Sequence, residues 1–418
     1  LLIVIYSLTG FAQKQLTLTP QQIEAIFLEQ NLQLIAERMN VDIADADIIQ
    51  AKLWENPSLS VSDISFWSSQ SQRDGESEII PPLFGSFGKN TQFSVELSQM
   101  IQTAGKRKKL VNREKISKEI IIQEFEDILR GLKTELRASI NEILYLQDYQ
   151  KVLLTQQESI SRLIETYRKQ VEQGNIPVKE LLRLQSALFE MENETNELQM
   201  GLNAHQKNLK ALLNTDPEAY IEIENSLSDI KDPKDITLPN LINTAMDARP
   251  DIKISALQTS YHQKSLVYEK SQRVPDITLN ANYDRWGGVW KNFVGVGISI
   301  DLPTFNRNQG NIKAAKIGKE QSEILAQQQQ RLAKHEIAEA YDNYMLSYGF
   351  YKKIADNQLF AMLDNMLEIY SKNLLNKNIS MLEYIDFMES YKSNKQTLLT
   401  AKRNMYLQFE ELQYTVGT

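Results

Sequence analysis

The sequence lacks cysteine altogether and has only three histidines among its 418 residues. Without cysteine the chain forms no disulfide, thiolate metal site or cysteine nucleophile. His205, His262 and His335 are scattered along the sequence, so a multi-histidine metal site within one chain is not expected. Nucleophile elbows, phosphate-binding loops and metal-ligand spacings are missing as well. We therefore predict that the protein is not an enzyme and has neither a cofactor nor a metal site.

An excess of basic charge is also missing. The 46 Lys and Arg residues are outnumbered by 54 Asp and Glu residues, which gives a net charge of −8. Nucleic-acid-binding proteins need clustered positive charge, so a nucleic-acid partner is not expected. Beyond the N-terminus, no stretch approaches the ~18 consecutive apolar residues of a transmembrane helix. The sequence therefore predicts no helical membrane span.

The N-terminus has the pattern of a secretory leader. Leu1–Leu8 is mostly apolar, and the small residues Gly10 and Ala12 follow before the first polar residues. We interpret residues 1–13 as the end of a signal peptide; a buried N-terminal strand is the alternative. The leader predicts export from the cytoplasm.

Two proline-free runs of 68 residues dominate the rest of the chain, Gly105–Glu172 and Gln309–Asn376. As a single helix, each would be about 100 Å long. Apolar residues recur in the first run at heptad spacing, at Phe125, Leu132, Leu146, Leu153, Ile160 and Tyr167. Such a sustained seam predicts coiled-coil-like packing against neighbouring helices. The alternative from this feature alone is an ordinary dimeric coiled coil.

Shorter helices and alternating strands complete the pattern. Helices are expected over residues 20–54 and 239–273, and each stops at a proline. Two β-hairpins are predicted next, over residues 57–103 and 275–304, because apolar and polar residues alternate there. The halves match closely: Tyr167 and Asn175-Ile176 correspond to Tyr370 and Asn378-Ile379 at an offset of 203 positions. This indicates a tandem duplication.

We accordingly divide the chain into a first repeat over residues 14–214, a connector over 215–238 and a second repeat over 239–418. Each repeat is predicted to run helix, hairpin, long helix, turn, helix. Each strand is about ten residues long, which suits a tilted strand that crosses a bilayer. Four such strands cannot close a barrel, since the smallest transmembrane barrels have eight. Several chains must therefore pool their strands and helices.

The ordered set of repeats, hairpins and helical turns resembles the outer-membrane efflux (TolC) family. The junction Gly105-Lys106-Arg107, with Asn306-Arg307-Asn308 as its counterpart, contributes to the likeness. The resemblance implies a mainly α fold with a membrane β-barrel portion. Three chains would form an α-barrel in the periplasm and a 12-stranded β-barrel in the outer membrane. Phe93–Lys109 is most similar to the heavy-metal cation (CzcC/CusC-like) branch.

The same resemblance implies a function. The homotrimer would be the passive exit duct of a tripartite pump, docked through a periplasmic adaptor protein to an inner-membrane resistance-nodulation-division transporter. Heavy-metal cations are the expected cargo. Multidrug efflux and type I protein secretion remain alternatives, and a periplasmic coiled-coil adaptor or structural protein is a remote one. We expect the inner-membrane pump to choose the cargo.

Two acidic residues are the candidate aperture. Glu383 and Asp386 are three residues apart on one helical face, where the family has paired acids around its periplasmic opening. In a trimer they would form two carboxylate rings that attract cations, and crowding would raise their pKa values. Acids at this spacing are otherwise usually a solvated face. Ile379 stands where a family member carries an arginine that ties the closed state, so the resemblance implies no such latch here.

Two further groups of residues are predicted to make contacts outside the chain. The turns between paired helices should dock the adaptor: Gly174, Asn175, Ile176 and Pro177, and Lys377, Asn378, Ile379 and Ser380. Basic and aromatic residues near the strand ends should contact outer-membrane lipid: Lys106, Arg107, Lys108, Trp286, Trp290 and Phe293. A solvated charged turn is the alternative for the three basic residues.

Overall fold

The computed structural model describes residues 15–64, 92–224, 233, 236–285, 290 and 292–418. The predicted signal peptide, most of the first hairpin loop and Trp286 lie outside this part of the chain. Two compact units are present. The helical unit comprises the residues up to Met39, Gln123–Lys253 and Gln328–Thr418. The sheet unit comprises Asn40–Ile122 and Ile254–Gln327.

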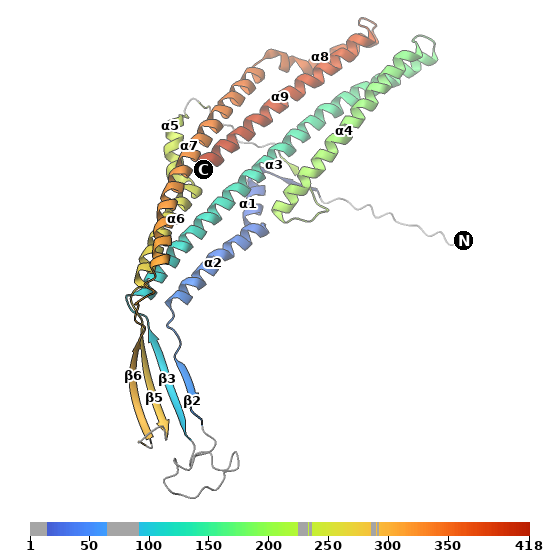
Figure 1. Cartoon of the computed structure of the whole chain (residues 1–418). Coiled ribbons are helices and arrows are strands. Elements are labelled where there is room, and N and C mark those ends of the chain that lie inside the picture. The colour runs from blue at the N-terminus through green and yellow to red at the C-terminus, as the bar shows by residue number, and fades with distance from the viewer. Residues whose placement is uncertain (1–14, 65–91, 225–232, 234–235, 286–289, 291) are drawn as a thin grey trace, which may run out of the picture. The chain divides into compact units, whose positions relative to one another are not determined.

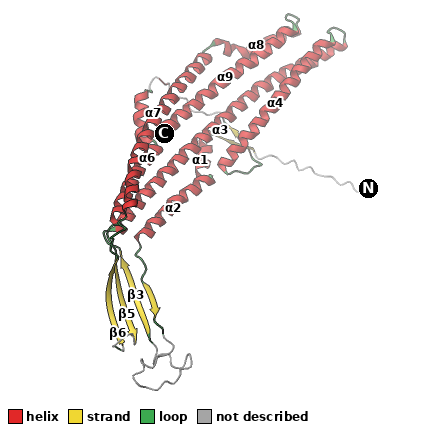
Figure 2. Ribbon diagram, viewed as in Figure 1, coloured by secondary structure: helices red, strands yellow, loops and turns green. Residues whose placement is uncertain are grey.

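Helices and strands follow one another in nearly the predicted order (Figures 1 and 2). The first half contains β1 (Gln15–Leu18), α1 (Pro20–Gln30), α2 (Leu32–Lys52), β2 (Ser58–Ser62), β3 (Phe93–Ile101), α3 (Lys106–Glu172), α4 (Val178–Leu213) and β4 (Tyr220–Ile223). The second half contains α5 (Leu238–Ala248), α6 (Pro250–Ser271), β5 (Ile277–Arg285), β6 (Asn292–Ile300), α7 (Gln309–Ala355), α8 (Gln358–Leu375) and α9 (Met381–Val416). Among the described helices, none is long and apolar enough to cross a membrane.

The long helix of the first repeat is continuous, but that of the second is not. The 67 residues of α3 form one helix. The corresponding run ends at Ala355 and restarts at Gln358, which corrects the prediction of a single helix. Asp356 and Asn357 separate the two segments, and short polar side chains of this kind compete with helical backbone bonds.

Two other predicted helices are also broken, each after 11 residues. Asn31 interrupts the first, and its Oδ1 caps α2 by accepting a bond from the Leu34 amide (2.9 Å). Arg249 interrupts the second, directly before Pro250, which disfavours helical backbone at the preceding residue. A proline inside the predicted helix over 239–273 was the sequence signal for that break.

The two hairpins form one antiparallel sheet in the sheet unit, with strand order β2-β3-β5-β6. Pairing between β3 and β5 joins the first repeat to the second, with Leu97 opposite Ala281, which in turn lies opposite Val296. This register places most apolar residues of all four strands on one face. The other face carries mainly Ser, Asn, Gly and acidic residues. Asp63 has a positive φ of 54°, and β2 ends directly before it, at Ser62.

A small pair of parallel strands was not predicted from the sequence. β1 lies beside β4 in the helical unit, with Gln15 opposite Tyr220 and Leu18 opposite Ile223. β4 falls within the predicted connector over residues 215–238. Its four residues alternate between half-buried and buried, but a segment this short gives little periodic signal.

The predicted heptad seams lie in the core of the helical unit. Leu153 is fully buried, and Leu132, Ile160 and Tyr167 are nearly so. They pack against residues from α1, α4, α8 and α9 in several hydrophobic clusters. Burial of a leucine or isoleucine side chain contributes about 2 kcal/mol, so these seams account for much of the attraction between helices.

Backbone conformation reveals the duplication independently of side-chain similarity. Three pairs of residues with positive φ are separated by 203 positions: Gly105 and Asn308, Gly174 and Lys377, and Asn214 and Gly417. They precede the long helices, lie in the turns between paired helices and end the last helix of each repeat. In the structure, Gly105 therefore corresponds to Asn308. The predicted alignment paired Gly105 with Asn306 instead, so it was wrong by two residues.

Candidate functional site

Both predicted tips are tight helical hairpins in the helical unit, drawn as loops between α3 and α4 and between α8 and α9 in Figure 2. After α3, Gly174 adopts a φ of 75° and the Asn175 amide donates to the Gln170 carbonyl (2.9 Å). After α8, Lys377 adopts a φ of 59° and the Asn378 amide donates to the Asn373 carbonyl (2.9 Å). The two turns thus have the same left-handed helix cap.

The candidate aperture residues Glu383 and Asp386 lie in the first two turns of α9, and both are exposed. Met381, Tyr384 and Met388 are buried on the same helix. At these spacings the two carboxylates project away from the core-facing side of α9. The structure therefore leaves both acids available to solvent.

Glu383 has a local structural role as well. Its Oε2 accepts bonds from the Ser380 amide (2.7 Å) and hydroxyl (2.9 Å), while its own amide donates to Ser380 Oγ (3.2 Å). This is a capping box. The Ser380 amide, and next its hydroxyl, lower the pKa of the Glu383 carboxyl below its usual value. A raised pKa from crowded acids concerns the assembled trimer and stays a prediction.

The first tip has different chemistry at the matching positions. Pro177 is the N-cap of α4 and provides no side-chain hydrogen bond. Glu180 corresponds to Glu383 but is half-buried, and Arg183 takes the place of Asp386. An exposed pair of acids therefore occurs at only one of the two tips.

A shared hydrophobic core joins the two hairpins behind these tips. The buried members come from α3, α4, α8 and α9: Ile160, Leu163, Ile164, Tyr167, Leu184, Met191, Leu363, Leu367, Leu374, Met381, Tyr384, Met388 and Tyr391. Ile379 packs against this core and is partly buried. Ile379 therefore has a packing role. The sequence alone showed only that it stands where a family member carries an arginine.

Polar contacts also connect the two hairpins. Gln156 is fully buried and donates from Nε2 to the Met388 carbonyl (2.9 Å). Glu194 accepts hydrogen bonds from the Tyr149 hydroxyl and from Lys392 Nζ (2.8 Å for the lysine). Any separation of α3 and α4 from α8 and α9 must break the Gln156–Met388 and Lys392–Glu194 bonds, whereas the Tyr149–Glu194 bond lies within the first hairpin. The two bonds between the hairpins therefore hold α4 and α3 to α9.

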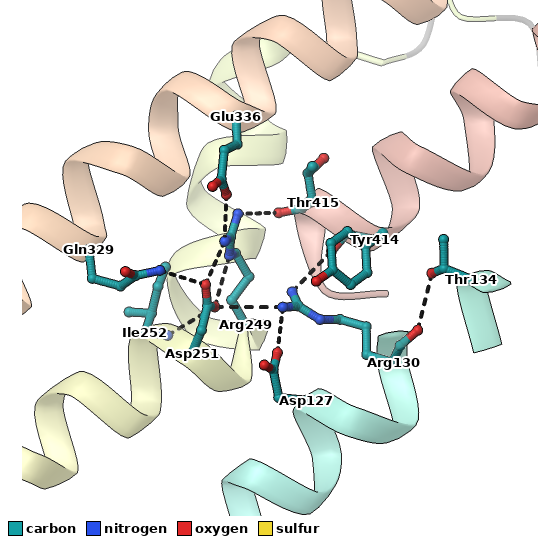
Figure 3. Close-up of polar contacts among 10 residues, drawn as sticks. All are labelled: Asp127, Arg130, Thr134, Arg249, Asp251, Ile252, Gln329, Glu336, Tyr414 and Thr415. Atoms are coloured by element: carbon teal, nitrogen blue, oxygen red, sulfur yellow. Dashed lines mark hydrogen bonds and ion pairs between the residues drawn. The ribbon is translucent and has the colours of Figure 1, made fainter. Parts of the chain in front are cut away.

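A second polar site lies at the end of α9 (Figure 3). Arg249 is only 3% exposed, and its Nη1 donates to the Thr415 carbonyl (3.0 Å). Its Nη2 lies 2.6 Å from Asp251 Oδ2 and 2.7 Å from Glu336 Oε2. Gln329 also donates to Asp251 (2.8 Å). One buried guanidinium thus links the start of α6 to α7 and α9.

Arg130 extends this ionic cluster to α3. It donates to Asp127 (2.5 Å) and to the Tyr414 carbonyl (3.0 Å), and Nη2 lies 3.9 Å from Asp251. Its guanidinium also stacks over the Tyr414 ring at 4.3 Å. The cluster therefore connects three long helices with the break between α5 and α6. Sequence analysis missed it because its members are distributed over nearly 300 positions.

The pKa values within the cluster reflect two opposing influences. Burial by itself would raise the pKa of the Asp251 carboxyl. Hydrogen bonding to Arg249, together with the charges of Arg249 and Arg130, instead lowers it below its ordinary value. For the Arg249 guanidinium, burial would lower the pKa, but the bonds to Asp251 and Glu336 raise it. Both groups are therefore charged near neutral pH.

Part of this architecture matches a known protein family. Residues 25–215, which span most of the first repeat, match the sequence profile described as "Outer membrane efflux protein". Over this part, a little under half of its length, the chain is similar to the outer membrane efflux protein family. The second repeat has the same order of elements apart from the break between α7 and α8, and its positive-φ residues lie at matching positions, so the architecture extends beyond the matched part.

The chain is similar to the cobalt-zinc-cadmium resistance protein CzcC of Cupriavidus metallidurans. It is 24% identical over 305 residues, which cover 71% of this chain and 66% of CzcC, just under two thirds of its length. Two solved channels share the fold. The CmeC outer membrane channel of Campylobacter jejuni has a TM-score of 0.76 at 16% identity, covering 95% of this chain and 85% of CmeC. CusC has a TM-score of 0.71 at 19% identity, covering 99% of this chain and 95% of CusC.

The structure corrects one predicted lipid anchor, Lys106. Lys106 is only 4% exposed, and its Nζ binds Asp276 Oδ2 at 2.8 Å within the sheet unit. Asp276 also accepts a bond from the Thr103 amide (2.8 Å). Lys106 therefore fixes the junction between β3, α3 and β5, and it does not face lipid. Phe293 pairs with Asp284 on the polar face of the sheet and is exposed, and its contact with lipid stays a prediction.

The remaining anchors have the exposure that the prediction requires. Lys108 is exposed, Trp290 is 70% exposed, and Arg107 is half-buried with its guanidinium over the Trp54 ring. Their contact with lipid stays a prediction. Within the described residues, no group of three His, Cys, Asp or Glu residues could hold a metal ion.

Proposed function

We propose that the chain is the outer-membrane exit duct of a tripartite efflux system, a passive channel without enzymatic activity. The observation that carries the proposal is the four-stranded sheet. Its two faces differ in polarity, and β2 and β6 each pair on one side only within the described residues. An open edge in hydrocarbon leaves backbone groups without partners, so the sheet must close with other copies. Three copies would supply twelve strands, an even number in the range of known barrels.

Exposed apolar residues support assembly with further copies. Leu28, Leu32, Ile35 and Met39 recur at helical spacing along α1 and α2 in the helical unit, and all are exposed in the isolated chain. A contiguous apolar stripe of this kind marks a protein interface. In the proposed homotrimer, neighbouring helices cover it. The assembled tube would dock a periplasmic adaptor and, through it, an inner-membrane resistance-nodulation-division pump.

Heavy-metal cations are the proposed cargo. Support comes from the relative named for cobalt, zinc and cadmium resistance and from the exposed acids Glu383 and Asp386. Three copies of each acid around one axis would give two rings of negative charge that attract cations and repel anions. Export of drugs or of proteins through the same duct is the competing proposal.

Growth of a deletion strain tests the function. The strain and a complemented strain are compared across cobalt, zinc, cadmium, copper, dyes, detergents and antibiotics. Sensitivity confined to metals supports metal efflux. Broad sensitivity to dyes and antibiotics favours a general drug duct, and the absence of any phenotype favours secretion.

Conductance across a planar bilayer tests the aperture. Glu383→Gln combined with Asp386→Asn should reduce both the preference for cations over anions and the block by multivalent cations from the helical side. The matched control is Glu389→Gln, which removes an exposed acid of α9 one turn further along. Equal selectivity in the double variant and the control would assign the aperture to other residues. Ser380→Ala separates lost charge from lost capping, because it breaks the capping box and keeps both acids.

Adaptor docking at the tips is tested at Gly174. A Cβ atom there would meet no heavy atom within 4 Å, so a bulky side chain would project into open space. Gly174→Trp should therefore weaken cross-linking to the adaptor while the trimer persists in detergent. Normal cross-linking in this variant would count against docking at the first tip.

A further inference from the structure

A basic pocket lies in the sheet unit, between the end of α2 and the start of α3. Its volume is about 360 Å³, and its polar lining consists of Lys52, Trp54, Glu55, Gln102, Arg107 and Lys108. The lining carries three cations and one acid, although the whole chain has a net charge of −8. Lys106 does not contribute, because Asp276 neutralises it. The pocket therefore has a local excess of positive charge that suits an anion.

One hydrogen-bond donor of the pocket, on Arg107, has no partner among the described residues. Its guanidinium lies 3.9 Å above the Trp54 ring, while its Nη1 is buried and has no hydrogen-bond partner. A buried donor without a partner is unfavourable by about 1–3 kcal/mol, and more when charged. Glu55, the one acid of the pocket, accepts instead from Gln102 Nε2 (3.3 Å). The planar guanidinium offers the geometry that phosphate oxygens bind in pairs.

The surroundings of the pocket indicate an amphipathic ligand. Trp54 is 61% exposed and Leu53 is 55% exposed, which is unusual for large apolar residues beside charged ones. A few residues further along the chain, β2 begins, with Leu59 and Val61 exposed on the apolar face of the sheet. Tryptophan at the boundary between a charged zone and an apolar surface is typical of a membrane interface. A free phosphate ion would use the cations but leave the apolar residues in water.

We propose that this pocket binds the phosphate headgroup of an anionic phospholipid, with Arg107 and Lys108 on the phosphate and Trp54 beside the glycerol and acyl chains. The inference rests on the proposed outer-membrane location. It also explains the adjacent cations Arg107 and Lys108, which oppose the dipole at the start of α3. A bound phosphate compensates those charges. One lipid per chain would fix the depth of the sheet in the bilayer.

Lipid binding to the purified, delipidated full-length trimer tests the proposal by native mass spectrometry. Phosphatidylglycerol is titrated against phosphatidylcholine for the wild type and for Arg107→Gln combined with Lys108→Gln. Each removed cation near a lipid surface weakens binding about fivefold, so the double variant should bind phosphatidylglycerol about 25-fold more weakly. Lys109→Gln is the matched control, because it removes an adjacent charge that does not line the pocket. It should bind like the wild type.

Two further measurements distinguish a lipid phosphate from free phosphate. Inorganic phosphate at millimolar concentration should not displace the lipid, and brominated acyl chains should quench Trp54 in a variant whose other three tryptophans are phenylalanine. Displacement by inorganic phosphate without such quenching would assign the pocket to free phosphate and overturn the lipid proposal. Equal binding of phosphatidylglycerol by the double variant and the control would overturn the site itself.

Folding and function are followed separately. Trimer retention on electrophoresis shows whether each variant is assembled, and Trp54→Ala provides a second disruption that leaves all charges in place. It should weaken phosphatidylglycerol binding as well, and unchanged binding would remove Trp54 from the site. Complementation of the deletion strain distinguishes the proposals: a wild type that fails to restore export challenges the duct, whereas lipid binding does not depend on export.

Discussion

The breaks between short helices in the two repeats perform the same task with different chemistry. In the first repeat, Asn31 donates from Nδ2 to the Leu212 carbonyl at the end of α4 (2.8 Å). In the second, Arg249 donates from Nη1 to the Thr415 carbonyl at the end of α9 (3.0 Å). Thr415 follows Leu212 by 203 positions, the offset of the duplication. Both side chains tie a broken helix to the last turn of their own repeat.

The difference shows what a charge demands of its surroundings. The Asn31 amide is satisfied by the Leu212 carbonyl and the Leu34 amide, so its junction needs no ions. A guanidinium at an equally buried position must be compensated, because burial of a lone charge is strongly unfavourable. Asp251 and Glu336 provide that compensation in the second repeat. The neutral junction binds one further helix, α4, whereas the ionic one connects to α3, α7 and α9.

The largest expected effect is the loss of Arg249. Arg249→Met should lower the free energy of unfolding by about 3 kcal/mol, because Asp251 and Glu336 keep their charges without the partner between them. Thermal unfolding of the purified protein in detergent measures it. Arg162→Met is the control, since Arg162 forms an exposed pair with Glu158 and should change stability by at most about 0.5 kcal/mol. Equal shifts in the two variants would contradict a structural role for the ionic cluster.

A smaller effect is expected at the neutral junction. Asn31→Ala should destabilise the protein by about 1–2 kcal/mol, through loss of the cap on α2 and of the bond to Leu212. Asn31→Asp separates these contributions in the same unfolding assay, because it keeps the cap acceptor and removes the donor. If Asn31→Ala lost more unfolding free energy than Arg249→Met, the neutral junction and not the ionic one would contribute more to stability.

The two junctions should also differ in acid. Because the folded pKa of Asp251 lies below its unfolded value of about 3.9, its contribution to stability is complete above that value. It is lost as the pH falls through the folded pKa. Asp251→Asn should therefore be less stable than the wild type at pH 7, and its stability should decline less on acidification below about pH 4. Asn31→Ala should keep the wild-type acid dependence, which unfolding curves at several pH values will check.

The tips allow a finer comparison. Gly174 and Lys377 occupy matching left-handed positions, where a residue with a side chain is strained by about 1 kcal/mol. Lys377→Gly should relieve that strain and raise the melting temperature slightly, while Gly174→Lys should lower it. Changes of the same sign in the two variants would show that contacts, and not backbone conformation, dominate at the tips.

The smallest effect is confined to one helical turn. Ser380→Ala removes the capping box of α9, so amide hydrogen exchange in its first turn should accelerate about fivefold. Pro177→Ala at the first tip removes no side-chain cap and should leave exchange in α4 nearly unchanged. If Ser380→Ala, like Pro177→Ala, left the exchange rates at their wild-type values, Glu383 would be held by a residue other than Ser380.

The sequence by itself determined the repetitive features of this protein. Period-seven and period-two patterns depend only on which residues share a face, so they located the α3 seams and the alternation in β3, β5 and β6. The proposed aperture acids were found in the same way, because their spacing and position relative to the turn are local. The order of elements, and with it the duplication, follows from these patterns.

Only the tertiary structure decided which polar residues are buried and what compensates them. Lys106 looked like a surface cation until the fold placed Asp276 beside it, 170 positions away. The same holds for Arg249, whose partners lie on α6, α7 and α9. The side chains at both helix breaks, Asn31 and Arg249, bind a carbonyl at the far end of another helix. Such pairings have no sequence period, because the free energy of a buried charge is set by whatever the fold brings next to it.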